Sequence, residues 1–464
     1  RGRRGRVMQQ AISYRDKHGF VRIADDCTVF RFVTYSYAKE YDLLMQSGLY
    51  KELVTRGRMI AHKESTMTPE QMPHYYKILE PEWIPVISYP SEWSVSQWKD
   101  VIARFLSINL LAIRHGMILK DATPYNFTFH DGKCLLFDTT SFAIYEDGQP
   151  WMAYRQFCEL MLGPFALMCF SDKHWGRLLN AFIDGWDLPF VSRNLPVKTW
   201  LNPTLLIHIH LHARYKRKGV VQADTTNGFN RQKLELWWQM LQRAIQRWEP
   251  RKHRRQQWLH YYDEGILSTD YINDKTNKVT EWISAGSSNC VIDAGANNGY
   301  FSLIAARYAK KVMAIEMDHD CVDQLYGQIK EQQINNLTAI IADLTQPTPG
   351  TGWKNEEKIA LIKRVEQKAD MILGLALVHH LCISKNIPLA FVAKLFAEIT
   401  TKHSIVEFIP KTDEKVQAML RNREDIFDDY TEANFIAAFS SYFTMQEQYS
   451  CKASQRKLFL WIRK

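Results

Sequence analysis

The stretch VIDAGANNGYFS (291–302) joins an apolar, strand-like run to the start of a helix through a turn that contains Gly295 and Gly299. Glycines at such a turn let the backbone come close to a ligand, and the first turn of the helix offers unpaired N–H groups. Asp293 follows the apolar run directly. Dinucleotide-binding proteins share Gly-rich turns of this kind, so the turn predicts a ligand site without naming the ligand.

The sequence after this turn alternates β-branched runs with helical patterns, which is typical of a parallel sheet with crossover helices. The last two strands lack a helix between them, which predicts an antiparallel hairpin at the sheet edge. A polar insert at 344–369 predicts a loop followed by a helix. The predicted strands are 290–293, 312–316, 337–342, 370–375, 404–408, a sixth near 442–448, and 457–463.

Acidic residues lie at the ends of three consecutive predicted strands. Glu316 ends the second strand, where a carboxylate can accept both hydroxyls of a ribose. Asp343 follows the third strand, in position for an adenine amino group. A dehydrogenase would favour GxGxxG without the preceding Asp293, so the pattern favours another adenosine-containing cofactor.

This set of motifs resembles the class I S-adenosylmethionine-dependent methyltransferases, in which the residue at the position of Asn297 is commonly glycine. The resemblance implies a Rossmann-like, seven-stranded methyltransferase domain with S-adenosyl-L-methionine as cofactor. Tyr262 and Tyr271, upstream of the first strand, are expected to cover the cofactor, although packing against the sheet explains them nearly as well. The implied cofactor-binding residues are Asp293, Gly295, Asn297, Gly299, Glu316, Asp343 and Tyr262.

The fourth strand runs into LGLALVHHL (373–381). In methyltransferases of this class the carboxyl end of that strand faces the methyl group, so His379 and His380 are candidate general bases. A histidine that only packs or hydrogen-bonds inside the domain is the alternative. Glu407, Lys411 and Asp413, in EFIPKTD (407–413) after the fifth strand, are second-choice site residues at the same mouth.

A second constellation lies in KDATPYN (120–126) and LLFDTTSF (135–142). Asp121, Asn126 and Asp138 follow the order of a protein kinase catalytic loop and its metal-binding aspartate, and phosphoryl transfer needs such groups. Residues 80–215 therefore resemble the larger lobe of the protein-kinase-like fold, with 84–91 as an interlobe strand and hinge, 94–116 as a long helix and 154–168 as a buried helix. The resemblance implies Asn126 and Asp138 as metal ligands, and Mg-ATP as a second cofactor, if the site with Asp121 is functional.

The kinase pattern is incomplete elsewhere. Residues 1–60 contain no GxGxxG loop, no V-A-I-K strand supplies a phosphate-binding lysine, and Lys63 is the nearest candidate for that role. Asp138 is followed by two threonines where kinases have Phe-Gly. These departures predict a degenerate α+β kinase-like domain that binds a ligand or a partner, with a working kinase as the alternative.

Length and composition agree with two globular domains. The 464 residues are 46% hydrophobic and 23% charged. The helical pattern at 232–248 ends at Pro250, where we place the boundary. We expect a kinase-like, acceptor-binding domain over 1–250 and a class I methyltransferase domain over 251–464.

The cysteines, the apolar runs and the net charge indicate where the protein is located and which partners it has. We expect a cytoplasmic protein with buried thiols and no membrane span. Its eight cysteines are well separated without a CxxC pair, no apolar run reaches about 20 residues, and we expect no signal peptide. The net charge of +9 comes from residues before 257; we interpret it as a solvated face and expect no nucleic-acid partner. His208, His210 and His212 are expected to be structural residues of a helix that do not converge.

Taken together, the halves resemble a bacterial methyltransferase family related to the host-specific nodulation protein of root-nodule bacteria. The resemblance implies methyl transfer to a hydroxyl of a sugar, a lipid-linked glycan or a small metabolite, with the basic first half binding the acceptor through phosphates where it carries them. A bifunctional kinase and methyltransferase acting on a glycan end, and a methyltransferase with a nucleotide- or partner-binding pseudokinase half, remain alternatives. The motifs that carry this resemblance are ISYPSEWS (87–94), HGMILKDATPYN (115–126), FDTTSF (137–142), PWMAYRQFCE (150–159), HIHLHAR (208–214), VIDAGANNGYFS (291–302), LALVHHL (375–381) and EFIPKTDEKVQAMLRNREDIFDDYT (407–431).

Overall fold

The computed structural model describes residues 16–24, 28–66, 74–217, 230–250, 268–421 and 424–464. Contacts divide the chain into unit 1, Arg1–Lys252 with Pro349–Ile359, and unit 2, His253–Thr348 with Ala360–Lys464. No helix within these described ranges has both the length and the apolar character needed to cross a bilayer.

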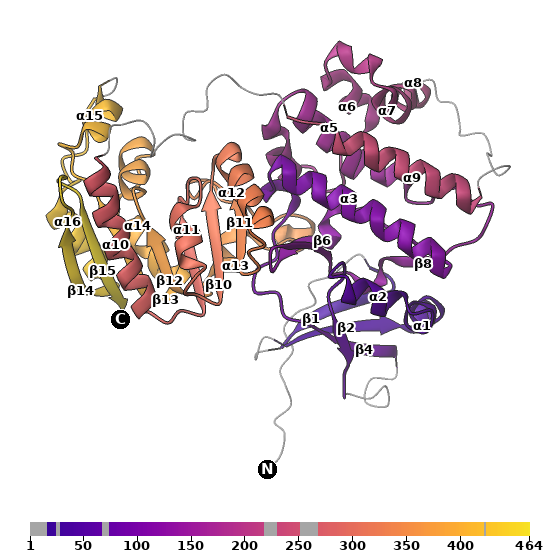
Figure 1. Ribbon diagram of the computed structural model, residues 1–464, viewed down its shortest axis with the longest axis horizontal. Coiled ribbons are helices and arrows are strands. Elements are labelled where there is room, and N and C mark those ends of the chain that lie inside the picture. Colours follow the sequence, from indigo (N-terminus) through magenta and orange to yellow (C-terminus); the bar gives the residue numbers. More distant parts are fainter. Residues whose placement is uncertain (1–15, 25–27, 67–73, 218–229, 251–267, 422–423) are drawn as a thin grey trace. The chain divides into compact units, whose positions relative to one another are not determined.

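Unit 1 begins with a four-stranded antiparallel sheet in the order β1-β2-β4-β3 (Figure 1). Two helices, α1 (Ala38–Gln46) and α2 (Leu49–Thr55), separate β2 from β3 in the chain. Alternate residues of the strands bury their side chains on opposite faces, so the sheet has an apolar layer on each side. The strands are β1 (Gly19–Ile23), β2 (Val29–Thr34), β3 (His62–Glu64) and β4 (Tyr75–Pro81).

The predicted interlobe strand over 84–91 is wrong. Strand β4 ends at Pro81, and residues 82–89 have no regular secondary structure before a short 3₁₀ turn, Pro90–Glu92. Pro85 lies inside the predicted strand and has no N–H to donate to a sheet.

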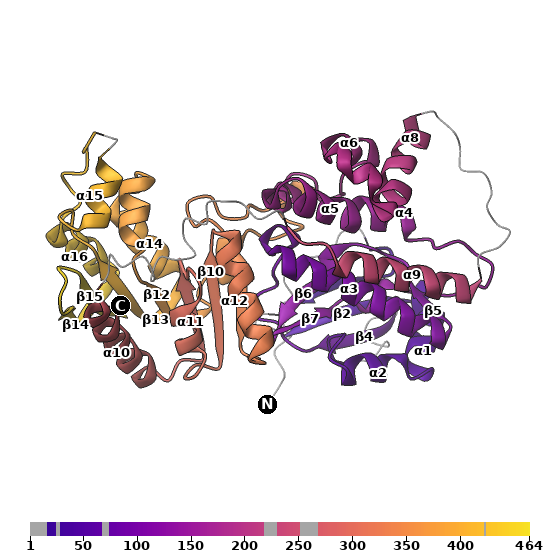
Figure 2. The same ribbon diagram turned by 45° about the horizontal axis from the view of Figure 1, so that its top comes forward.

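The rest of unit 1 is mostly helical, and its predicted helices are confirmed. Helix α3 (Val95–Ala112) starts at Ser94, whose hydroxyl accepts from the Gln97 N–H in a capping box. The buried helix predicted at 154–168 consists of α4 (Tyr154–Gln156), a π-helical segment (Phe157–Leu162) and α5 (Gly163–Phe170). Helix α9 (Arg231–Gln246) lies beside α3 (Figures 1 and 2).

Short strands and helices complete unit 1. The hairpin of β6 and β7 connects the two halves of the kinase-like constellation. The elements are β5 (Met117–Leu119), β6 (Phe127–His130), β7 (Lys133–Leu136), β8 (Phe142–Ile144), α6 (Leu188–Asn194), α7 (Pro203–Leu205), a π-helical segment (Leu206–Leu211) and α8 (His212–Arg217).

Unit 2 is built on a seven-stranded sheet in the order β11-β10-β9-β12-β13-β15-β14. Neighbouring strands are parallel except β15, which is antiparallel to both β13 and β14. The predicted strands and the terminal antiparallel hairpin are confirmed, and so is the Rossmann-like, seven-stranded fold expected for this part of the chain. The strands are β9 (Cys290–Ala294), β10 (Lys311–Glu316), β11 (Leu337–Ile341), β12 (Ala369–Gly374), β13 (Thr400–Phe408), β14 (Phe443–Ser450) and β15 (Lys457–Arg463).

Helices cover both faces of this sheet. One face packs against α10 (Thr269–Ala285), α11 (Tyr300–Ala305) and α12 (His319–Glu331) in a single apolar cluster. On the other face, α14 (Leu389–Ile399) and α16 (Glu432–Ser440) meet through the Phe396 and Phe439 rings, and Phe439 stacks on Trp461 of β15. The predicted insert is a loop followed by the short helix α13 (Leu361–Val365), and α15 (Glu414–Leu420) follows β13. Ligands of such sheets bind outside the carboxyl ends of the parallel strands.

Candidate functional site

The Gly-rich turn has the backbone that its sequence predicts. Gly295 and Gly299 have φ of +73° and +81°, and a Cβ on Gly299 would lie 2.3 Å from Leu325 Cδ1. Asn297 has φ of 51°. Asparagine tolerates this left-handed region better than most residues with a side chain, which explains why it replaces a glycine here.

Asp293 and Glu316 end the neighbouring strands β9 and β10 and lie close enough to interact electrostatically. Asp293 is buried, and its Oδ2 accepts a 2.6 Å hydrogen bond from the Ser302 hydroxyl. Burial raises the pKa of Asp293 to about 6, although the Ser302 bond opposes this shift. Burial also raises the pKa of Glu316. A ligand that offers positive charge or hydroxyl donors would therefore stabilise the ionised form of both carboxyls.

The carboxylate of Glu316 already binds the Gly-rich turn. Its Oε2 accepts from the Asn297 N–H at 2.8 Å, and its Oε1 accepts from the N–H groups of Met317 and Asp318 at 2.7 and 2.9 Å. Three of about four acceptor positions are thus filled. The sequence predicts that Glu316 accepts both ribose hydroxyls, but this arrangement has room for only one. The remaining position is on Oε2.

Asp343 follows β11, as predicted, at the same edge of the sheet. The Ala342 N–H donates to the Glu316 backbone carbonyl at 2.9 Å, which sets Asp343 beside the end of β10. Oδ1 of Asp343 accepts from the N–H and hydroxyl of Thr345, while Lys385 Nζ lies 3.8 Å from Oδ2. The structure thus brings Asp293, Glu316 and Asp343 to one edge; Tyr262 lies outside the described residues.

The sheet reverses its order between β9 and β12, and this topological switch point places two predicted segments together. A Cβ built on Gly295 would lie 3.0 Å from Leu377 Cδ1, so the Gly-rich turn touches the segment after β12. In that segment Ala376 has φ of 52°. Such a backbone is costly for a residue with a side chain, and observed strain of this kind clusters at functional sites.

His379 and His380 follow this strained residue. His379 is 1% exposed, and neither of its ring nitrogens has a hydrogen-bond partner within the described part of the chain. Burial lowers the pKa of His379 well below its usual value and that of His380 to about 4. The rings lie 4.1 Å apart, and His380 begins a π-helical segment, His380–Ser384. Both imidazoles are therefore neutral near pH 7, and the His379 ring can donate or accept a hydrogen bond.

A buried charge network lies at the carboxyl end of β13 and includes two of the second-choice residues. Glu407 accepts from the Lys275 ammonium at 2.6 Å and from the Tyr271 hydroxyl. Arg456 donates to both oxygens of Asp413, at 2.8 and 3.0 Å, and its Nη1 lies 3.4 Å from the Tyr271 hydroxyl. Tyr271 thus has a hydrogen-bonding role in addition to its packing in the core cluster.

Two members of this network were missed by sequence reasoning. Lys275 lies one helical turn after Tyr271 on α10, and that spacing is the signal that could have found it. Arg456 precedes β15 and carries no comparable signal. Lys411, predicted at the same mouth, instead pairs with Asp425 at 2.8 Å, with side chains 23% and 45% exposed.

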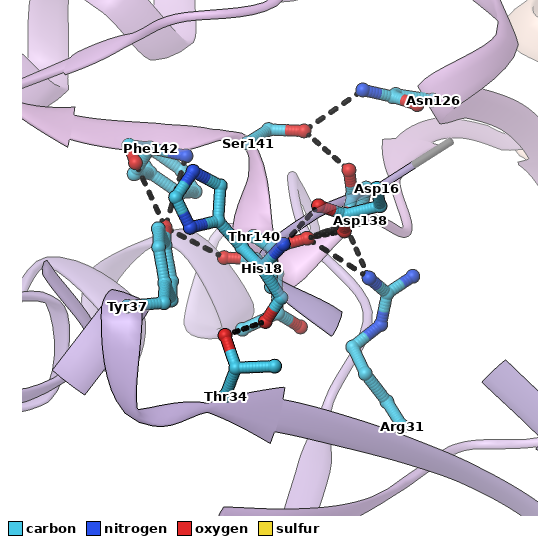
Figure 3. A network of polar contacts seen from close by, with 11 residues as sticks. Asp16, His18, Arg31, Thr34, Tyr37, Asn126, Asp138, Thr140, Ser141 and Phe142 are labelled. Carbon is cyan, nitrogen blue, oxygen red and sulfur yellow. Dashed lines mark hydrogen bonds and ion pairs between the residues drawn. The ribbon is translucent and has the colours of Figure 1, made fainter. Parts of the chain in front are cut away.

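In unit 1, Asn126 and Asp138 of the Asp-Asn-Asp constellation belong to a polar network around Asp138 (Figure 3). Arg31 Nη1 lies 2.5 Å from Asp138 Oδ1, and the Thr140 hydroxyl lies 2.8 Å from both Asp138 Oδ1 and Asp16 Oδ2. Ser141 donates to Asp138 Oδ2, and Asn126 donates to Ser141, both at 2.8 Å. Although burial opposes it, Arg31 holds the pKa of Asp138 below its usual value. Asp121 is half-buried, and burial raises its pKa.

The basic residue that meets Asp138 is Arg31 and not Lys63. Lys63 lies on β3, its side chain is 76% exposed, and it pairs with Glu80 at 3.0 Å. Arg31 is the one charged residue in VFRFVT, a mostly apolar strand, and a charge inside a buried strand is the signal that could have identified it.

The expectation that the histidines of HIHLHA do not converge is wrong for two of them. His208 Nδ1 and His212 Nε2 both lie against the Tyr154 hydroxyl, at 2.8 and 3.0 Å. They are four residues apart and therefore share one helical face. His210 instead contacts Ser192 and Thr199.

Comparison with known proteins gives a match along nearly the whole chain. The nodulation protein NoeA of Rhizobium meliloti (strain 1021) is 28% identical over 470 residues, covering 99% of this chain and 97% of that protein. The 23S rRNA (uracil(1939)-C(5))-methyltransferase RlmD of Pseudomonas putida is 33% identical over 75 residues, 16% of this chain and 17% of that protein. No family model matches the chain.

Among solved structures, the N-methyltransferase NodS of Bradyrhizobium japonicum WM9 aligns with 42% of this chain and 98% of its own, at 11% identity and a TM-score of 0.31. The chain is thus similar over nearly its full length to a nodulation protein, and over a short stretch to an rRNA methyltransferase.

Proposed function

We propose that the chain is an S-adenosylmethionine-dependent methyltransferase that methylates a hydroxyl of a sugar, a glycan or a small metabolite. The observation that carries this proposal is the set of three carboxylates, Asp293, Glu316 and Asp343, beside a Gly-rich turn at the topological switch point of a methyltransferase sheet. When bound, S-adenosylmethionine supplies an electrophilic methyl group.

The residues at the switch point fit this cofactor. Glu316 keeps one acceptor position for a ribose hydroxyl, Asp293 is a buried carboxyl that favours the ligand's ammonium or ribose edge, and Asp343 is in position for an adenine amino group. Gly295, Asn297 and Gly299 hold the turn in a left-handed backbone that lets the ligand approach.

His379 is the proposed general base. It lies beyond the carboxyl end of β12, is neutral near pH 7, and has no hydrogen-bond partner among the residues described. A buried polar group without a partner is rare and points to a missing ligand or water. The acceptor hydroxyl supplies that partner, and its proton passes to the imidazole as the oxygen gains the methyl group.

Unit 1 is proposed to be a kinase-like domain over 1–250 that binds the acceptor. Its sheet order, the helix that follows β2, and the β6-β7 hairpin between Asn126 and Asp138 support this assignment. The excess of basic residues before 257 is suited to an acceptor that carries phosphates. Residues 251–464 then form the catalytic domain.

Thermal stabilisation by S-adenosylhomocysteine tests the cofactor site, because a ligand that binds only the folded protein raises its melting temperature. We expect a shift in the wild-type protein and none in Asp293→Ala. Asp370→Ala removes a carboxylate at the amino end of β12, at the opposite end of the strands from the proposed site, and should keep the shift. A wild-type protein that shows no shift would rule out the proposal.

The acceptor class is tested by release of S-adenosylhomocysteine from S-adenosylmethionine in the presence of a panel of sugars, sugar phosphates and nucleotide sugars. We expect turnover with hydroxyl acceptors. Turnover with amine or nucleic-acid acceptors only would contradict O-methylation while leaving the cofactor assignment intact.

A further inference from the structure

We infer that Arg31 takes the place of a divalent cation in unit 1, so that the Asp138 site binds its ligand without magnesium and does not carry out metal-dependent phosphoryl transfer. The inference concerns unit 1 alone and does not depend on the methyl transfer proposed for unit 2. It rests on Asn126 and Asp138, which the kinase resemblance implies as metal ligands. In the network of Figure 3 both side chains form hydrogen bonds within the protein.

Asp138 keeps at most one acceptor position, on Oδ2, for a metal ion. Its Oδ1 accepts from Arg31 Nη1 at 2.5 Å and from the Thr140 N–H at 3.0 Å, and it lies 2.8 Å from the Thr140 hydroxyl. Its Oδ2 accepts from the Ser141 hydroxyl at 2.8 Å. Each carboxylate oxygen has about two acceptor positions, so Arg31 and the Thr140 N–H already fill Oδ1, and one position on Oδ2 remains.

Asn126 turns its amide nitrogen, and not its amide oxygen, toward the Ser141 hydroxyl beside Asp138. Its Nδ2 donates to the Ser141 hydroxyl, which in turn donates to Asp138. Magnesium binds oxygen and not amide N–H groups, so in this hydrogen-bonded chain Asn126 is committed as a donor. A metal would require Asn126 and Ser141 to rearrange together.

The fold holds Arg31 in place. It lies on the central strand β2, between Val21 of β1 and Leu79 of β4, and is only 8% exposed. Its guanidinium stays charged at any pH that a protein tolerates. A divalent cation on the same carboxylate would meet this fixed positive charge a few ångströms away, and the repulsion is strong where solvent is scarce.

The described residues elsewhere offer no substitute metal site, since they contain no group of three or more His, Cys, Asp or Glu side chains arranged to hold a metal ion. The arrangement therefore favours a non-catalytic, ligand-binding kinase-like lobe over a bifunctional kinase and methyltransferase.

Electron paramagnetic resonance with Mn²⁺ alone as the probe tests this inference on the full chain, because bound Mn²⁺ loses the signal of the free ion. We expect the wild-type protein and Asp138→Asn to leave the same free-ion signal. Arg31→Ala is expected to bind Mn²⁺ at least about tenfold more tightly than the wild type, since it frees Asp138 Oδ1 and removes the repelling charge. The double variant Arg31→Ala/Asp138→Asn should lose that gain.

Arg22→Ala is the matched control, because Arg22 lies on the adjacent strand β1 and packs over Phe20 and Phe32 without reaching Asp138. It should bind no more Mn²⁺ than the wild type. Arg31→Lys, which keeps the charge, should also stay metal-free and covers the case in which Arg31→Ala fails to fold. Mn²⁺ binding by the wild-type protein that Asp138→Asn abolishes would overturn the inference, as would a folded Arg31→Ala variant with no gain in affinity.

Discussion

The Lys275 ammonium lies 2.6 Å from the Glu407 carboxylate, and the two side chains are 2% and 0% exposed. This pair joins helix α10 to the carboxyl end of β13. Although burial opposes ionisation, the Lys275 and Arg456 cations hold the pKa of Glu407 below its usual value. Buried charges are costly to place, and clusters of them are most often found at functional sites.

Replacement of Lys275 by methionine should therefore destabilise unit 2. The change leaves the Glu407 carboxylate buried with less compensation, and loss of one partner of a buried pair costs about 3–5 kcal/mol. The free energy of unfolding is measured in urea. Unit 2 is identified by the unfolding transition that shifts when S-adenosylhomocysteine is added.

Two comparisons check this interpretation. The double variant Lys275→Met/Glu407→Gln should recover part of the loss, because it removes the uncompensated charge. Lys394→Met removes a lysine from a pair with Glu398 whose side chains are 56% and 41% exposed, and should change stability little. A loss for Lys275→Met no larger than for Lys394→Met would show that the buried pair does not stabilise unit 2.

Asp293→Asn should stabilise unit 2 at pH 7 and abolish cofactor binding. Burial raises the pKa of Asp293 to about 6, from a usual value near 4, so the folded state holds the proton to higher pH than the unfolded chain. Stability contributed by this group therefore falls as pH rises from about 4 to about 6. Asparagine removes that cost, about 3 kcal/mol for a shift of about two units, and can still accept from Ser302.

Asp370→Asn supplies a control of opposite sign. Although burial opposes it, the Asn289 N–H and Lys402 hold the pKa of Asp370 below its usual value, so its ionised form stabilises the fold. The same chemical change should therefore reduce stability at pH 7 and leave S-adenosylhomocysteine binding intact. If Asp293→Asn were instead the destabilising variant, the burial cost assigned to that carboxyl would be wrong.

Cofactor affinity should depend on pH through the same carboxyl. Below pH 6 Asp293 is protonated and no longer attracts the ammonium of the ligand, so we expect the S-adenosylhomocysteine Kd to rise about tenfold per pH unit between pH 6 and pH 4.5. Calorimetric titration at several pH values measures this slope. Glu316→Gln, which removes the neighbouring titrating group, should bind more weakly but keep the slope; a flat profile in the wild type would exclude Asp293 as the ammonium partner.

The sequence predicts unit 2 more completely than unit 1, for physical reasons that particular residues make clear. Strand β15 is predicted at 457–463, residue for residue, because KLFLWIR is apolar and bounded by polar segments. Gly295 and Gly299 were identified because a close backbone approach restricts which residues fit. The false strand at 84–91 arose from an apolar run whose proline removes a sheet donor.

Long-range partners were the part that sequence could not supply. Arg31 and Asp138 are 107 residues apart, and Tyr271 and Arg456 are 185 apart. A charged residue inside a strand or helix shows which local face it occupies, but only the fold shows which distant carboxylate it meets. For Asp138, the sequence showed its place after a predicted hairpin, but its partner Arg31 lies in another element.

His379→Asn should abolish most methyl transfer without weakening cofactor binding. Positioned general bases contribute about 10²–10⁴ in rate, so the release of S-adenosylhomocysteine with the best acceptor of the panel should fall by about that factor. Because burial holds the His379 pKa well below its usual value, the imidazole stays in its basic form where a free histidine titrates, and wild-type turnover should show no fall near pH 6.5 from its protonation.

His380→Asn and His403→Asn complete this test. The His380 ring lies tilted against the His379 ring, and His380 begins a π-helical segment, so its loss should reduce turnover less than the loss of His379. His403 lies toward the amino end of β13, away from Glu407, and its replacement should leave turnover unchanged. Equal loss in all three variants would indicate a general effect on folding, whereas full turnover in His379→Asn with S-adenosylhomocysteine binding retained would assign the base to another residue.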